Sequence, residues 1–192
     1  MRRILFALSL ITWLTACGGE KKGGEFSRKP VSVRGWVLDV KGAQRAESME
    51  MELFRRQQLF QSTSLWVENN QYASGGIAEN GAFIVLDVPP GASVVGFNAP
   101  GAESARLTLK DVPGTADVFI PDVVLEKGGA TVLDPAKIQV RLASNVSKRT
   151  PTGQTAYVAG HAIPVIQVPI AELTDRREYP KPPGYRPVAT VK

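Results

Sequence analysis

The sequence predicts an all-β chain: a single antiparallel β-sandwich followed by an extended, proline-rich C-terminal segment. Two observations carry this prediction. Short runs of apolar residues are separated by turn signals about every 8 to 12 residues, which is typical of sandwiches. In addition, Asn80-Gly81 precedes the apolar run of residues 82–86, and this pair predicts a two-residue hairpin turn in which both residues have positive φ.

The first predicted strand spans residues 31–39, where valines alternate with polar residues, and Lys41-Gly42 marks the turn after it. In residues 49–54, Met49, Met51 and Leu53 alternate with two glutamates and a phenylalanine, and we interpret the segment as a second strand. The strong helix formers across residues 46–59 allow a helix as the alternative. The strand interpretation is favoured because the segments on both sides look like β-structure.

Later strands end at clusters of proline and glycine, because proline removes a backbone donor and glycine permits a tight turn. The segments predicted as strands or as β-rich are residues 57–67, 82–86, 93–97, 105–109, 116–125 with an interruption at Pro121, 138–142, and 155–170 with Pro164 and Pro169 at edges or bends. The remaining segments are predicted as loops at 68–71 and 145–154, one helical turn at 171–177, and polyproline II at 179–187, with a disordered tail as the alternative for the last segment.

Charge and composition exclude some classes of function. The formal charge of +5 includes Arg2 and Arg3, and the basic residues are scattered rather than clustered with exposed aromatic residues. Nucleic-acid binding is therefore not expected. His161 is the only histidine and Cys17 the only cysteine, so sites built from several imidazoles or thiolates are excluded, and no metal or other cofactor is predicted.

The N-terminus has the pattern of a secretory signal: two arginines, then an apolar run from residue 4 to residue 13. This run is shorter than the roughly 20 apolar residues that span a bilayer. Leu14-Thr15-Ala16-Cys17 resembles the lipobox of bacterial lipoproteins. The resemblance implies cleavage before Cys17 and a membrane anchor of acyl (palmitate-type) chains on that residue. The alternative is a buried N-terminal helix with an incidental cysteine.

The predicted organisation follows from this signal. Gly18, after the acylated cysteine, implies sorting to the outer membrane in a Gram-negative host, on its periplasmic face or its surface. The predicted parts are residues 1–16 as signal peptide, 17–30 as lipidated cysteine and flexible tether, 31–128 as the sandwich domain, and 129–192 as an extension with further strands and a proline-rich tail.

A second resemblance lies in the middle of the chain. The residues that carry it are Gly81, Phe83, Val85, Val88, Pro90, Gly91, Val94 and Phe97, with Gly35 in the first strand. They resemble the carboxypeptidase regulatory-like domain over residues 31–127, while residues 48–72 depart from it. The resemblance implies a prealbumin-like sandwich of seven strands that acts as a structural or binding module. It implies no catalytic residue.

Few residues are candidates for chemistry. His161 is interpreted as a strand-edge histidine, and Asp87, Asp111, Asp117 and Asp122 as solvated turn acids, because no calcium-loop spacing is present. Aromatic residues within strand patterns are predicted to pack in the core, with a ligand or partner contact as the alternative for Trp66. The aromatic residues concerned are Trp36, Trp66, Phe83, Phe97 and Tyr157.

Three functions remain open. The favoured one is a lipid-anchored, non-catalytic module that binds an envelope protein or a glycan. The second is an envelope hydrolase that acts on glycan or peptide with paired carboxylates. The third is a subunit of an envelope complex that docks through its C-terminal arm, where Tyr179 and Tyr185 offer apolar surface.

Overall fold

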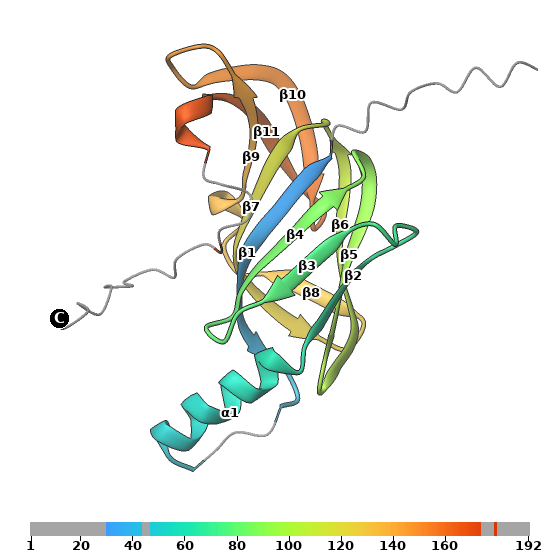
Figure 1. Cartoon of the computed structure of the whole chain (residues 1–192), viewed down its shortest axis with the longest axis vertical. Helices are drawn as coiled ribbons and strands as arrows, with labels where there is room; N and C mark the ends of the chain where they lie inside the picture. The colour runs from blue at the N-terminus through green and yellow to red at the C-terminus, as the bar shows by residue number, and fades with distance from the viewer. Residues whose placement is uncertain (1–29, 44–46, 174–178, 180–192) are drawn as a thin grey trace, which may run out of the picture.

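The computed structural model describes residues 30–43, 47–173 and 179 (Figure 1). Strands make up 59% of these residues, which confirms the mostly β prediction. Eleven strands form one sheet in the order β2-β5-β6-β10-β11-β9-β7-β1-β4-β3, with β8 paired to β7. The strands are β1 Val31–Val40, β2 Ser64–Val67, β3 Ser74–Ile77, β4 Ala82–Val88, β5 Gly91–Ala99, β6 Ala102–Val112, β7 Ala116–Glu126, β8 Gly129–Val132, β9 Gln139–Ser144, β10 Thr150–Val158 and β11 His161–Pro169.

The sheet curls until its two end strands, β2 and β3, lie near each other, so the structure is barrel-like and nearly closed (Figure 1). Two separate packed sheets are not seen among the described strands. The core fills the inside of the curl, where Phe83 and Phe97 are fully buried and meet edge to face with ring centroids 5.2 Å apart. These two rings and Trp36 are buried as predicted.

β1 lies at the centre of one side of the sheet, antiparallel to β4 and parallel to β7. Its valines point into the core, as the alternation predicted. Gly35 is required where β1 pairs with β7, because a Cβ at this position would lie 1.8 Å from the carbonyl oxygen of its partner Ile120. Close approach of two backbones is a common reason for glycine inside a strand.

The hairpin predicted at Asn80-Gly81 joins β3 to β4, but its turn is not the predicted two-residue type. Gly81 has a φ of +83°, whereas Asn80 is not among the residues with positive φ. The Gly81 N–H donates to the Ala78 carbonyl at 2.8 Å, and the Ala78 N–H donates to the Ala82 carbonyl at 2.7 Å. This is a three-residue loop that ends on a left-handed glycine.

The strand predicted over residues 49–54 is wrong, because this segment belongs to helix α1, Met49–Gln61. The helix also contains residues 57–61 of the strand predicted over 57–67, of which only Ser64–Val67 forms a strand. Ser48 caps the helix: its side-chain oxygen accepts a hydrogen bond from the Met51 N–H at 3.3 Å. The last turn is anchored to the sheet by buried Leu59 and Phe60. The first turns of α1 project away from the sheet (Figure 1).

The C-terminal strands are inserted among the N-terminal strands of the sheet. β10, β11 and β9 lie between β6 and β7, so strands from both sides of the predicted boundary at residue 128 share one sheet. β10 begins at Thr150, within the segment predicted as a loop. Pro164 pairs with Thr155 of β10 beside a register shift in that ladder, and Pro169, paired with Ser144 of β9, is the last residue of β11. The two prolines therefore lie at a bend and at a strand end.

Three predictions about individual side chains are wrong. Trp66, predicted to pack in the core, is only partly buried and is not part of the core cluster. Asp117 is buried rather than solvated: it accepts from Ser32 Oγ at 3.0 Å, from Arg34 Nη2 at 2.7 Å and from Arg141 Nη2 at 2.9 Å. Burial lowers the pKa of Arg141, while the charge of Asp117 opposes that change. Tyr157 is 39% exposed rather than in the core, and its ring lies 5.6 Å from Lys110 Nζ.

After β11 the chain forms a single turn of 3-10 helix, Ile170–Glu172, which overlaps the start of the helical turn predicted at residues 171–177. The proline-rich segment, apart from Tyr179, lies outside the described residues, as do the signal sequence and the tether up to residue 29. No helix in residues 30–43, 47–173 or 179 combines the length and apolar character needed to cross a membrane.

Candidate functional site: a pocket at the seam of the sheet

The line between β2 and β3, where the sheet does not close, is called the seam here. β2 pairs only with β5, and β3 only with β4. The Glu68 N–H donates to the Val94 carbonyl at 3.0 Å. Since antiparallel pairs alternate along a ladder, the backbone groups of Leu65 and Val67 point away from β5 and toward the seam. The Ala78 N–H donates to the Ala82 carbonyl, so the same alternation applies to β3 and β4. The backbone groups of Gly75 therefore point away from β4 and toward the seam.

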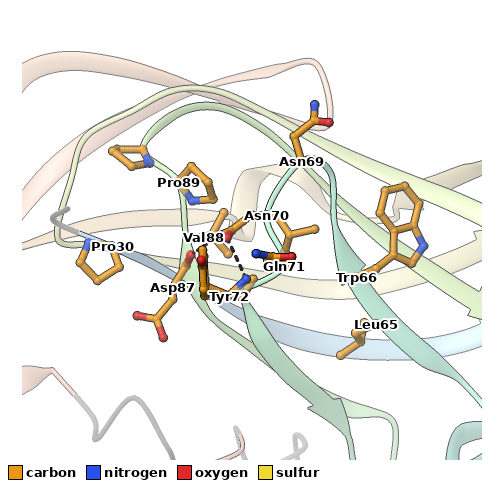
Figure 2. A pocket seen from close by; sticks show the side chains of 13 residues that line it. Pro30, Leu65, Trp66, Asn69, Asn70, Gln71, Tyr72, Asp87, Val88 and Pro89 are labelled. Carbon is orange, nitrogen blue, oxygen red and sulfur yellow. Dashed lines mark hydrogen bonds between the residues drawn. The ribbon is translucent and has the colours of Figure 1, made fainter. Parts of the chain in front are cut away.

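A pocket of about 1000 Å³ lies at this seam, near the start of β1 (Figure 2). Three segments distant in sequence form its walls: the end of β2 with the loop after it, the turn between β4 and β5, and the residue before β1. In Figure 2, Leu65 and Trp66 lie on one side and Pro30, Asp87 and Pro89 on the other. The lining residues are Pro30, Leu65, Trp66, Val67, Asn69, Asn70, Gln71, Tyr72, Ala73, Asp87, Val88, Pro89 and Pro90.

Asn70 fixes the loop that forms the middle of this wall. Its side-chain oxygen accepts from the Tyr72 N–H at 3.0 Å, and its side-chain nitrogen donates to the Asp87 carbonyl at 2.8 Å. Its own N–H donates to the Val67 carbonyl at 3.2 Å. The loop is thereby tied both to β2 and to the β4–β5 turn, and Tyr72 is held on it with 66% of its surface exposed.

Trp66 lies flat against the outer face of β5. It pairs with Gly96, and a Cβ on that glycine would lie 1.8 Å from the indole ring. The Arg106 guanidinium, which comes from the strand on the other side of Gly96, lies 5.8 Å from the ring centroid. Glycine on one side and a cation–π contact on the other fix the position of the ring at the pocket wall.

The remaining polar side chains of the pocket are Asn69, Gln71 and Asp87, all exposed. In the described part of the chain, none of these three side chains has a hydrogen-bond partner. Each amide offers both donors and an acceptor, and the carboxylate offers acceptors only. Asp87 is the only charged residue among the lining residues. Nowhere in the described ranges do three His, Cys, Asp or Glu side chains gather closely enough to hold a metal ion.

The residues proposed as sites from the sequence are scattered. Trp66 lines the pocket, whereas the Tyr179 hydroxyl lies against Gly76 of β3, outside the lining, with the residue 41% exposed. His161 is exposed at the first position of β11. Asp111 and Asp122 have φ values of +56° and +55° and do not line the pocket. The lipobox residues Leu14, Thr15, Ala16 and Cys17, and also Tyr185, lie outside the described residues.

Sequence reasoning missed Asn69, Gln71 and Tyr72, which were predicted only as loop or not at all. The available signal was the run of adjacent amides followed directly by an aromatic residue. No protein-family model matches the chain, and the search of curated proteins found no match. The two resemblances inferred from the sequence therefore remain predictions.

Proposed function

We propose that the chain is a non-catalytic binding protein of the cell envelope, anchored by lipid on Cys17, that takes its ligand in the seam pocket. The observation that carries the proposal is the pocket wall. It combines an exposed Tyr72 with the amides of Asn69 and Gln71, whose hydrogen-bonding groups have no partner in the described structure. Apolar walls with a few convergent polar groups are the usual composition of a ligand site.

A binding role fits this pocket better than hydrolysis. Glycosidases use two carboxyl groups roughly 5 to 9.5 Å apart, and Asp87 supplies one carboxylate among the lining residues. The lining includes no imidazole and no thiol. The carboxypeptidase regulatory-like resemblance and its sandwich, which we retain as part of the proposal, also imply a module without its own chemistry.

The position of the pocket relative to the predicted anchor supports a ligand close to the membrane. Pro30 lines the pocket and is the last residue of the predicted tether. A flexible chain of that length has a root-mean-square span of roughly 20 Å. The lipid on Cys17 would therefore hold the pocket near the membrane surface, with α1 at the opposite end of the molecule (Figure 1).

The anchor is tested by Cys17→Ser. We expect the variant to be recovered in the soluble fraction. Cys17 is the only lipid acceptor in the proposal, so the variant would carry none of the acyl chains, more than one of which is required for stable anchoring. The measurement is membrane fractionation after a high-salt wash, with Ser48→Ala as the matched control that should stay with the membrane. A Cys17→Ser protein that still sediments with membranes would refute the anchor.

The pocket is tested by retention of the full chain on immobilised envelope material. We expect Tyr72→Ala to reduce retention and Tyr157→Ala to leave it unchanged. Both changes remove an exposed tyrosine, but only Tyr72 lines the pocket. Equal retention of the two variants and the wild type would show that the pocket is not the binding site.

A further inference from the structure

We infer that the ligand of the seam pocket is a neutral saccharide. This inference rests on the proposed function and adds the chemical class of the ligand. Charge is the first reason. Asp87 is the only charged residue among the described residues that line the pocket, so an anionic ligand would meet a like charge there.

Hydrogen bonding is the second reason. An apolar ligand would cover the amides of Asn69 and Gln71 and the carboxylate of Asp87 without giving them partners, and such unpaired polar groups are costly. A sugar hydroxyl both donates and accepts, so it can pair with an amide in either sense and can donate to a carboxylate. A ligand rich in hydroxyl groups therefore satisfies all three side chains.

Ring shape is the third reason. A pyranose presents C–H bonds on its face and hydroxyl groups around its rim, and the face of an aromatic ring carries negative charge that attracts such C–H groups. Tyr72 is exposed at the pocket, and Trp66 lies at its wall beside Leu65 (Figure 2). The pocket volume of about 1000 Å³ is at the upper end of the usual range for small-molecule sites, roughly 300 to 1000 Å³. It suits a short oligosaccharide better than a single sugar.

The wall is organised before any ligand arrives. Asn70 ties the loop to both β2 and the β4–β5 turn, and Gly96 and Arg106 hold the Trp66 ring. Binding then needs little ordering of the protein, which favours affinity for a ligand that makes individually weak contacts.

An extended peptide is the competing occupant, because strand edges accept added strands. The edge available here is short: β2 has four residues, and the Val67 carbonyl is already bonded to the Asn70 N–H. Few main-chain hydrogen bonds are therefore available to a peptide at this end of the seam. The amide, carboxylate and aromatic side chains of the pocket favour a saccharide instead.

The experiment uses the full chain in a detergent without a sugar headgroup. Calorimetric titrations are made with cellotetraose, with the tetramer of N-acetylglucosamine, and with an uncharged extended decapeptide. We expect at least one tetrasaccharide to bind. Gln71→Ala and Tyr72→Ala should each weaken it about ten-fold, as the loss of one hydrogen-bonding or stacking partner implies. Tyr157→Ala should bind as the wild type does.

Two results would overturn the saccharide. The first is that neither tetrasaccharide binds with a dissociation constant below about 10 mM, which is too weak for specific recognition, while the decapeptide binds and Tyr72→Ala weakens the binding of the decapeptide. The pocket would then still be a binding site, but its ligand would be a peptide. The other is tetrasaccharide binding that Gln71→Ala and Tyr72→Ala leave unchanged. If retention on envelope material is also insensitive to Tyr72→Ala, the proposed function fails together with the ligand class.

Discussion

Asp117 is one carboxylate shared by two guanidinium groups on the outer side of the β1–β7–β9 region. Arg34 and Asp117 are both buried, and the Arg34 Nε has no partner within the described residues. The cluster carries one more positive than negative charge even when all three side chains are in place. Removing the carboxylate would leave two neighbouring cations, one of them fully buried, without a counter-charge.

We predict that Asp117→Ala lowers the free energy of unfolding by about 3 to 5 kcal/mol, because breaking a buried ion pair leaves an uncompensated charge. Urea denaturation followed by tryptophan fluorescence measures the change. Glu126→Ala is the matched control: it removes the exposed pair with Lys41, and such pairs contribute at most about 1 kcal/mol. Equal losses in the two variants would contradict the role assigned to Asp117.

At the scale of elements, α1 shows how a strand pattern can mislead. Met49, Met51 and Leu53 alternate with glutamates, but all three are exposed on the projecting turns of the helix. With no buried face, their spacing carries no information about packing, and intrinsic helix propensity and the Ser48 cap determine the conformation.

The anchoring of α1 gives a prediction with a built-in control. Phe60 is 3% exposed and contacts the hairpin at Gly81, whereas Phe54 on the same helix is 61% exposed. Phe60→Ala should reduce stability by about 3 to 5 kcal/mol, and Phe54→Ala by no more than about 0.5 kcal/mol. Thermal or urea unfolding of the two variants compares them directly. Similar losses would mean that the projecting turns of α1 are packed after all.

The C-terminal arm is tested through Tyr179, whose hydroxyl lies where a Cβ on Gly76 would come within 2.5 Å of it. This contact with β3 favours an arm that begins by packing on its own sheet. Deleting residues 179–192 should lower the melting temperature by about 4 °C, roughly 1 kcal/mol or less at this size. Deleting residues 180–192 keeps Tyr179 and should have a smaller effect. Identical melting of both truncations and the full chain would exclude a strap.

Strand and turn positions could be predicted wherever the signal is local. The β4–β5 region was found because Phe83, Phe97 and the Pro-Pro-Gly turn between them specify burial and breaks within a few residues. Strand order could not be predicted, since nothing local shows that β10 pairs with β6. The pocket was missed for the same reason: Tyr72 and Asp87 meet only through the fold.

At the scale of the whole molecule, the sheet order makes the two halves of the chain interdependent. β9, β10 and β11 separate β6 from β7, so a fragment that ends at residue 128 would lose β10 beside β6 and β9 beside β7. We predict that residues 31–128 alone do not unfold cooperatively in a thermal melt. A sharp transition in this fragment would show that the first half is an independent domain.

The control is residues 30–192, which retain every described strand. We expect this chain to be soluble, to melt cooperatively, and to give a far-ultraviolet circular dichroism spectrum dominated by β-structure. A helix content above about a third, the average for globular domains, would contradict the sheet described above, because the helical elements of the described residues are α1 and two short 3-10 turns.

The seam also determines where the molecule can open without unfolding. Closed rings of strands have no edge, but here the amide protons of Leu65 and Gly75 point toward the gap rather than into a ladder. Amides of this kind exchange with solvent through small local openings, while those of the central strands require global unfolding. Because the pocket lies on the same line, a ligand that joins the Asn70 loop to the β4–β5 turn would slow the opening of the seam. The hydrogen-exchange rates of the Leu65 and Gly75 amides would then show whether the pocket is occupied, without any probe on the ligand or on a side chain.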